Sequence, residues 1–280
     1  MKHQTWILWG VAVFITVGTA VFQRITGPTY PMSGEVLLGE ERVGYVLKRS
    51  EEQKNAVISI PVSDAAVTGR VEWRRHLTDD PWSSAPMVNA DVNTGVNTGV
   101  NGKRILTGEL PVQPPAGKLD YRVVVEKAGA TAQIPAGEPA VIRFKGGVPL
   151  GVLIPHVIVI FMAMLLSTRA GLEFFAAEPK LKGLSLWTVV FLFVGGLVLG
   201  PLVQKYAFDA YWTGWPFGTD LTDNKTAVAL LGWVAAAIGI RRSKYGGRWA
   251  LVAALILLIV FLIPHSLFGS SLQYSKMGGS

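Results

Sequence analysis

The chain has 280 residues, of which half are hydrophobic and only 16% are charged. This composition is too apolar for an ordinary soluble domain of this size and indicates burial in a membrane. The absence of cysteine excludes disulfides, thiolate metal sites, iron–sulfur clusters and a cysteine nucleophile.

The net charge of +7 is distributed unevenly and does not indicate nucleic acid as a partner. Between residues 35 and 145, fourteen Lys or Arg are matched by fourteen Asp or Glu, so the excess lies beside the apolar segments. Eight of the flanking cations fall on segments that alternate along the chain, as expected for loops that share the cytoplasmic side. They are Lys2, Arg169, Lys180, Lys182, Arg241, Arg242, Lys244 and Arg248.

The first apolar run extends from Trp6 to Phe22. It can be an uncleaved anchor or a signal peptide, because Gly18-Thr19-Ala20 would serve as a cleavage site of small residues. The run is longer than the apolar region typical of a signal peptide, which favours an anchor over residues 1–24. Under both interpretations, the segment that follows is exported from the cytoplasm.

Residues 25–147 alternate polar and apolar positions in short runs, which is typical of strands. The clearest strand covers residues 118–126, where Leu119, Tyr121, Val123 and Val125 fall on one face. About seven such runs predict a β-sandwich, and roughly 120 residues are enough for it to form its own core without disulfides.

One turn in this region carries a resemblance to known domains. The sequence from Leu110 to Gly117, leading into the strand that contains Tyr121, resembles the turn before a late strand in fibronectin type III and immunoglobulin-like domains of bacterial surface proteins. The resemblance covers about 80 residues. It implies a sandwich fold, and adhesion or docking more readily than chemistry.

Four more spans are predicted in residues 148–280, at about 148–168, 184–204, 226–240 and 248–265. A cytoplasmic amino terminus places the loops 169–183 and 241–247 inside, and these two loops carry six of the eight clustered cations. The prediction is an α + β protein of the bacterial inner membrane. It has five transmembrane helices, an exported immunoglobulin-like β-sandwich inserted between the first two, and an extracytoplasmic carboxyl terminus.

Two histidines follow Ile-Pro pairs at the predicted spans, namely His156 and His265. An ionisable side chain in a membrane is a functional hypothesis by default, since burying it without a partner is costly. The two could ligate one b-type haem from opposite sides. The simpler interpretation is a neutral histidine bonded to a neighbouring carbonyl, with no cofactor.

The loop at 205–225 is rich in aromatic and acidic residues. Tyr211, Trp212, Trp215 and Phe217 fit an interfacial belt and, with Asp220 and Asp223, a surface for a partner. Asp209, Asp220 and Asp223 offer oxygen ligands for a hard cation or for catalysis. Alternatively, Thr222 or Asp223 caps the helix that follows.

Small residues at four-residue spacing mark the third and fourth predicted spans. Gly196 with Gly200, and Gly232 with Ala236, predict that these spans pack on each other or on a partner. His76, Asp79, Asp80 and Ser83 contain the residue types of a hydrolase triad. They lack a nucleophile elbow, which favours a solvated sheet edge.

The pattern as a whole favours a non-enzymatic accessory or docking subunit. It would be surrounded by membrane lipids and would bind a protein partner or envelope component through the exported sandwich. One alternative is a haem- or pigment-associated redox subunit that uses His156 and His265. Another is an interfacial enzyme that modifies lipid or envelope material with the loop at 205–225.

Overall fold

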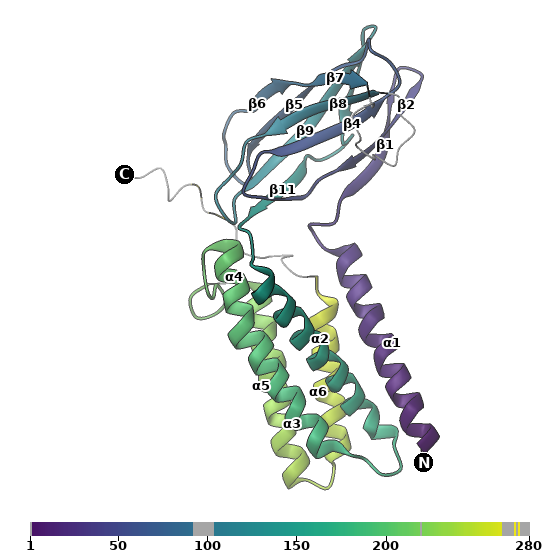
Figure 1. Ribbon diagram of the computed structural model, residues 1–280, viewed down its shortest axis with the longest axis vertical. Helices are drawn as coiled ribbons and strands as arrows, with labels where there is room; N and C mark the ends of the chain where they lie inside the picture. The colour runs from purple at the N-terminus through teal and green to yellow at the C-terminus, as the bar shows by residue number, and fades with distance from the viewer. Residues whose placement is uncertain (1, 92–103, 219, 265–271, 273, 275–280) are drawn as a thin grey trace. The chain divides into compact units, whose positions relative to one another are not determined.

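The structure is a computed structural model that describes residues 2–91, 104–218, 220–264, 272 and 274 (Figure 1). It divides into two compact units. Residues 1–28 and 148–270 form a helical unit, and residues 29–147 and 271–280 form a unit built from strands.

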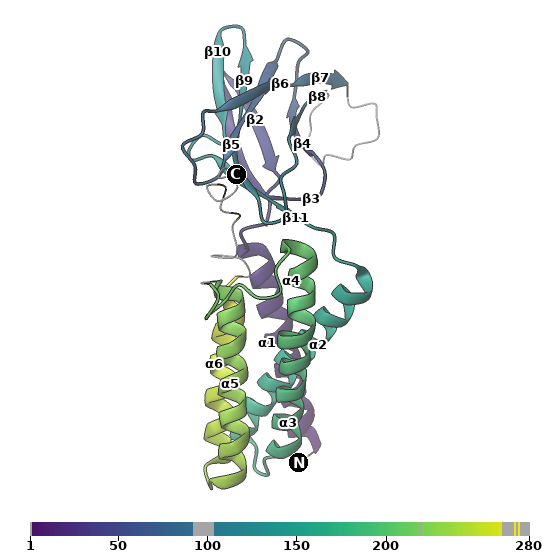
Figure 2. The ribbon, with the colours of Figure 1, turned by 90° about the vertical axis from the view of Figure 1, so that its left-hand side faces the viewer.

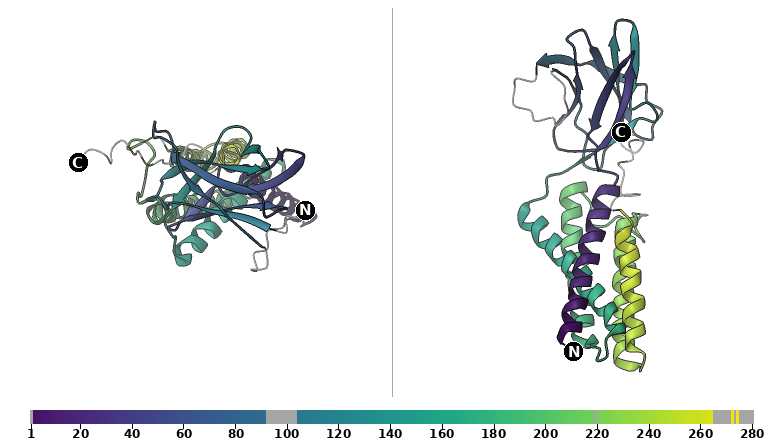
Figure 3. Two further views of the ribbon diagram at one scale, coloured as in Figure 1. Left: turned by 90° about the horizontal axis from the view of Figure 1, so that it is seen from above. Right: turned by 90° about the vertical axis from the view of Figure 1, so that its right-hand side faces the viewer.

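The helical unit contains α1 (Lys2–Thr26), α2 (Leu150–Leu172), the 3₁₀ turn η1 (Glu173–Phe175), α3 (Leu181–Leu192), the π-helical segment η2 (Phe193–Leu199), α4 (Gly200–Phe208), α5 (Leu221–Arg242) and α6 (Gly246–Leu262). Figure 3 (right) shows these helices aligned side by side, with α1 in purple. Because α3, η2 and α4 follow one another without a break, they make one continuous helical segment.

Three of these segments are long and apolar enough to cross a membrane, namely Thr5–Thr26, Leu150–Phe175 and Leu181–Phe208. This finding is consistent with a membrane protein. The sequence predicted five spans, and within the described residues α5 does not meet these criteria while α6 is apolar but shorter.

The interior of the helical unit is lined by side chains such as Leu192, Trp233 and Leu257. The indole Nε1 of Trp233 donates a hydrogen bond to Ser167 Oγ at 2.9 Å, which satisfies its buried polar atom. Large apolar side chains such as Phe14 and Leu231 lie on the exposed surface instead. An apolar exterior of this kind is expected of helices that face lipid.

Glycines set the distance between neighbouring helices. A Cβ on Gly196 would lie 2.5 Å from Thr226 Cγ2, so this glycine lets η2 approach α5 as predicted. A Cβ on Gly239 would lie 2.5 Å from the Trp249 ring, and the nearest neighbour of Gly232 is Ile256. The second glycine seam therefore faces α6 and not the third predicted span, because the short link at 243–245 makes α6 the neighbour of α5.

The second unit contains eleven strands: β1 (Met32–Leu38), β2 (Glu41–Leu47), β3 (Ser50–Glu52), β4 (Ala56–Val62), β5 (Thr68–Arg75), β6 (Ser83–Pro86), β7 (Val88–Asp91), β8 (Arg104–Leu110), β9 (Lys118–Lys127), β10 (Ala130–Ile134) and β11 (Ala140–Lys145). One sheet has the order β3-β11-β9-β5-β6, with β10 also paired to β9, and another has the order β4-β8-β7. A hairpin of β1 and β2 completes the unit (Figure 2).

The core of this unit lies between the sheets and is built from alternating positions. On β9, the predicted inward residues Leu119, Tyr121, Val123 and Val125 are all buried, which confirms that alternation. Tyr121 Oη donates to the carbonyl of Lys48 at 2.7 Å, so its only polar side-chain atom has a partner. The sequence predicted about seven strands, and the structure adds short edge strands that local patterns did not reveal.

The end of the chain also belongs to the sandwich. Tyr274 Oη accepts a hydrogen bond from the Lys118 amide at 3.0 Å and donates to Gln113 Oε1 at 3.2 Å. The amide of Leu272 donates to the carbonyl of Ala116 at 3.1 Å. Leu272 and Tyr274 are therefore held by the start of β9 and the loop that precedes it, an attachment that the sequence did not predict.

Candidate functional site

The loop between α4 and α5 is organised by Asp223. One carboxylate oxygen, Oδ2, accepts hydrogen bonds from the amides of Thr213 at 2.6 Å and Gly214 at 3.0 Å and from Gln204 Nε2 at 3.2 Å. A Cβ on Gly214 would lie 2.6 Å from Asp223 Cβ, so only glycine lets the backbone come this close. Asp223 thereby joins α4, the loop and α5.

Asp220 caps the amino terminus of α5. Its Oδ1 accepts from the Thr222 amide at 2.7 Å, and its Oδ2 accepts from Thr213 Oγ1 at 3.2 Å. The sequence predicted a cap at Thr222 or Asp223, and this assignment was wrong because the helix begins earlier, at Leu221. The earlier start also brings Lys225 into the helix, where its side chain is buried.

Lys225 connects the start of α5 with the end of α6. Its Nζ donates to the carbonyl of Ile263 at 2.7 Å, directly after the last residue of α6. The final carbonyls of a helix lack intrahelical donors and carry partial negative charge. A lysine at this end supplies a hydrogen-bond donor and a compensating positive charge. Asp220 supplies a further charge of opposite sign near Lys225.

His156 on α2 is held by the π-helical segment. Its Nδ1 lies 3.0 Å from the carbonyl of Gly195, which also accepts from the Gly200 amide. A carbonyl can only accept, so Nδ1 carries the proton and Nε2 of the neutral ring remains an acceptor. The predicted bond between this histidine and a neighbouring carbonyl is confirmed. His265 lies outside the described residues, so the haem pair stays a prediction.

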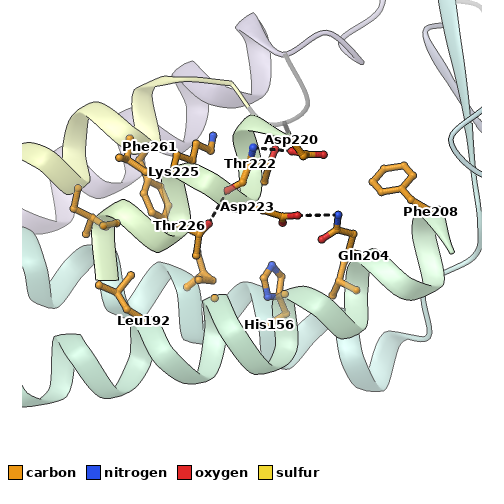
Figure 4. Close-up of a pocket in the computed structure, with 17 residues that line it drawn as sticks. His156, Leu192, Gln204, Phe208, Asp220, Thr222, Asp223, Lys225, Thr226 and Phe261 are labelled. Atoms are coloured by element: carbon orange, nitrogen blue, oxygen red, sulfur yellow. Dashed lines mark hydrogen bonds between the residues drawn. The ribbon is translucent and has the colours of Figure 1, made fainter. Parts of the chain in front are cut away.

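These groups converge on one cavity of about 160 Å³ (Figure 4). His156 approaches from α2 and Gln204 from α4, while Asp223 and Lys225 line it from α5. Apolar side chains, among them Leu192 and Phe261, close its remaining walls. A cavity of this size accommodates a few water molecules or one six-membered ring.

Asp209 does not join the other two acids. It occupies the carboxyl end of α4 with a left-handed φ of 60°, and its carboxylate pairs with Lys205 Nζ at 2.6 Å in a largely exposed position. Within the described residues, no group of three or more His, Asp or Glu side chains is arranged to hold a metal ion. Asp209, Asp220 and Asp223 therefore do not form the single ligand set that the sequence suggested.

The aromatic residues of the same loop lie mainly on its surface. Trp215 and Phe217 are 77% and 83% exposed, Tyr211 is also exposed, and Trp212 is half-buried. Trp212 Nε1 donates to the carbonyl of Trp215 at 3.1 Å, which fixes the loop without covering its rings. This arrangement suits an aromatic belt at a membrane–water interface.

A second ordered surface lies on β5 and β9 of the sandwich. Glu72 accepts from Arg70 at 2.8 Å and from Arg122 at 2.7 Å, and Arg70 also pairs with Glu126 at 2.6 Å. Burial opposes ionisation of Glu72, but the two guanidinium groups outweigh it and lower the pKa of this carboxyl below its ordinary value. The network therefore holds neighbouring strands together through charged side chains on the outward face.

Trp82 completes this surface. Its ring lies 4.4 Å from the guanidinium carbon of Arg122 and 4.9 Å from that of Arg74, within the range of cation–π attraction. Nearby, His76 Nδ1 lies 2.5 Å from Asp120 Oδ1, whereas Asp80 pairs with Arg75. His76 thus contacts an acid that is 44 positions away in sequence and not Asp79 or Asp80 of its own turn. The hydrogen bonds that a hydrolase triad would need between His76 and these acids are therefore not formed.

The sequence reasoning missed Gln204, Thr213 and Lys225. Gln204 lay at the last position of the predicted span 184–204 and was not recognised as a polar contact. Thr213 and Lys225 were assigned to the loop, because the next predicted span began at residue 226, where the apolar run starts. The sequence did contain one signal that the helix starts before residue 226. Asp223 and Thr226 are one helical turn apart, which would place two polar side chains on the same face of a helix.

No protein-family model, no curated protein and no solved structure matches the chain. Function is therefore inferred from the residues of the chain and their geometry.

Proposed function

We propose that this protein is a docking subunit of the bacterial inner membrane. Its sandwich, exported from the cytoplasm, binds a protein partner or an envelope component. The observation that carries the proposal is the tryptophan–arginine face. We define it as Arg70 and Arg74 on β5, Arg122 on β9, and Trp82 just before β6. Tryptophan and arginine dominate the energetics of protein interfaces, and here their side chains are already ordered by their mutual contacts.

The strand order supports an immunoglobulin-like sandwich. The sheets β4-β8-β7 and β6-β5-β9-β11 correspond to the strands B-E-D and C′-C-F-G of that fold, and Trp73 on β5 occupies the strand that carries its core tryptophan. The chain departs from the pattern in β3, which pairs in parallel with β11, and in the added β1–β2 hairpin. Such sandwiches commonly serve as binding modules, although the fold alone does not specify a ligand.

The attachment of Tyr274 supports five spans. Because Tyr274 and Leu272 bond to the sandwich, the end of the chain must share its side of the membrane, and the number of crossings between them is even. The segments 150–175 and 181–208 supply two crossings. The hairpin of α5 and α6 then crosses twice or not at all. We favour two crossings, because α5 packs on α3 and α6 packs on α2.

The distribution of cations supports the orientation. The links between α2 and α3 and between α5 and α6 lie at the same end of the helical unit as the start of α1 (Figure 1). These links and the helix ends beside them carry Arg169, Lys180, Lys182, Arg241, Arg242 and Lys244. Loops rich in Lys and Arg remain in the cytoplasm, so the opposite end of the helices and the sandwich are exported.

Docking is tested with the full chain purified in mild detergent from its own host after light cross-linking. Trp82→Ala removes the ring between two guanidinium groups, and we expect the yield of a stoichiometric partner to fall by about tenfold or more. Arg42→Ala is the matched control, because Arg42 is an exposed arginine on the separate β1–β2 hairpin. Equal recovery with Trp82→Ala and wild type would refute docking through this face.

The cavity supports a second candidate, an interfacial enzyme acting on lipid or envelope material. Its supporting observation is that His156, Asp223 and Lys225 line one cavity between helices. His156→Gln retains a donor for the Gly195 carbonyl while removing the ring, so turnover of envelope lipids in reconstituted vesicles should disappear without loss of folding. An absorption spectrum of the same preparations tests the haem alternative, since a bound haem would give a strong Soret band.

A further inference from the structure

A second pocket lies at the opposite end of the helical unit from the polar cavity. It has a volume of about 680 Å³ and opens to the surface where α1 begins and where α2 connects to α3. Its lining includes Trp9 from α1, Arg169 from the end of α2 and Glu173 from η1. It also includes Lys180 from the connection to α3 and Lys182 from the start of α3. The charged side chains of the lining are therefore three cations and one acid.

Arg169 is the buried cation of this pocket. Its residue is only 3% exposed, and its Nη1 lies 2.6 Å from Glu173 Oε1. This contact is an ion pair without hydrogen-bond geometry, because Nε and Nη1 of Arg169 both lack a hydrogen-bond partner. Buried donors are nearly always satisfied in proteins, and a guanidinium group left without acceptors is costly. Within the described residues, the hydrogen-bonding capacity of the Arg169 guanidinium is therefore only partly used by its own chain.

Glu173 balances the charge of Arg169 but engages only part of its guanidinium fork. Its second oxygen, Oε2, already accepts from the Lys180 amide at 2.6 Å, which fixes the carboxylate against the turn. The ring of Trp9 lies 5.5 Å from the Arg169 guanidinium carbon and covers it from α1. Arg169 is thus held in place by a carboxylate and an aromatic face while part of its fork remains without acceptors.

The rim of the pocket carries additional positive charge. Lys180 and Lys182 are exposed, and neither forms an ion pair within the part of the chain that the structure describes. The Arg169–Glu173 pair is neutral as a whole, so the two lysines give the pocket a net positive charge. Leu181, Leu184 and Ile240 add apolar walls beside these cations.

We propose that this pocket binds a phosphate group, carried by an anionic phospholipid or present as free phosphate. Arginine forks match the oxygens of phosphate, and lysines at the rim add long-range attraction. Basic pockets at the ends of membrane helices suit phospholipid head groups, and the apolar walls would contact the adjoining part of such a lipid. The site is separate from the docking face and does not depend on it.

The experiment uses the full chain in detergent and native mass spectrometry. The added probes are phosphatidylglycerol, phosphatidylcholine of the same chain length and sodium phosphate. We expect one retained phosphatidylglycerol, and about 30-fold weaker retention in Lys180→Gln/Lys182→Gln, given the attraction of an anionic head group to each lysine. Arg169→Lys keeps the charge opposite Glu173 but loses the fork, and we expect about tenfold weaker retention.

Arg241→Gln/Arg242→Gln removes the same charge from the neighbouring link without touching the lining of the pocket, and it should retain the lipid as wild type does. Displacement of the lipid by sodium phosphate, or retention of phosphate alone, would assign the site to free phosphate. Equal retention of phosphatidylcholine, or equal loss in the control variant, would overturn the proposal. Retention of none of the probes would do the same.

Discussion

The helical unit contains two buried clusters of charged residues that differ in how their hydrogen bonds are satisfied. At one end, Asp223 and Lys225 bond to loop amides and to the last carbonyl of α6, so the chain completes its own contacts. At the other end, Arg169 has an ion partner but retains donors without acceptors. The difference teaches that burial and charge alone do not mark a binding site. Our phosphate-site proposal therefore rests on the combination of the partly satisfied Arg169, the open pocket beside it and the lysines at its rim.

The largest effect is expected from Glu173→Ala. This change leaves Arg169 buried without its counter-charge, and breaking a buried ion pair from one side costs about 4 kcal/mol of unfolding free energy. Glu178→Ala is the control, because Glu178 is an exposed acid in the same connection. The free energy of unfolding in mixed detergent micelles measures both variants. Similar stabilities would show that Arg169 does not depend on Glu173.

Asp223→Ala should have the next largest effect. It leaves the amides of Thr213 and Gly214 without their acceptor in a buried turn, at a cost of about 3 kcal/mol. Asp209→Ala removes an exposed acid of the same loop and should cost less than about 1 kcal/mol. The same unfolding assay compares them, and an equal loss in both variants would contradict the structural role assigned to Asp223.

Substitution of Glu72 on the sandwich is expected to have the smallest effect on stability, and that effect should depend on pH. Hydrogen bonds from Arg70 and Arg122 lower the pKa of Glu72 in the folded state, despite the opposing effect of burial. A lowered pKa contributes stability above the unfolded value of 4.5, and that contribution disappears as the pH falls through the folded value. In the wild type the thermal unfolding midpoint of the sandwich should fall as the pH drops below about 4.5, and in Glu72→Gln this fall should be smaller. An unchanged pH profile would contradict the pairing.

Local patterns in the sequence predicted those parts of the fold that depend on local periodicity. The alternation through Tyr121 identified the buried face of β9, and the long apolar runs located the helices. Contacts between distant residues were not predictable in this way. Asp120 meets His76 across two strands, and Tyr274 meets Lys118 from the far end of the chain.

The candidate sites were predicted less completely than the fold, and for a physical reason. His156 was singled out because an ionisable side chain is costly in a membrane. Asp220 and Asp223 were singled out because their carboxylates could ligate a cation or contact a partner. Lys225 escaped attention, since hydropathy assigned it to a loop, although its role at the end of α6 depends on a helix 38 residues later. The pocket around Arg169 was represented in the sequence only by cations that also serve to orient the helices.

The orientation of the sandwich relative to the membrane is the claim on which the docking proposal depends. The chain has no cysteine, so single cysteines can report it with a membrane-impermeant maleimide on intact spheroplasts. Thr131→Cys in the sandwich and Phe217→Cys in the aromatic loop should react at once. Lys182→Cys and Lys244→Cys should react only after the membrane is permeabilised. Protection of residue 131 in intact spheroplasts, or immediate labelling of residues 182 and 244, would contradict the account.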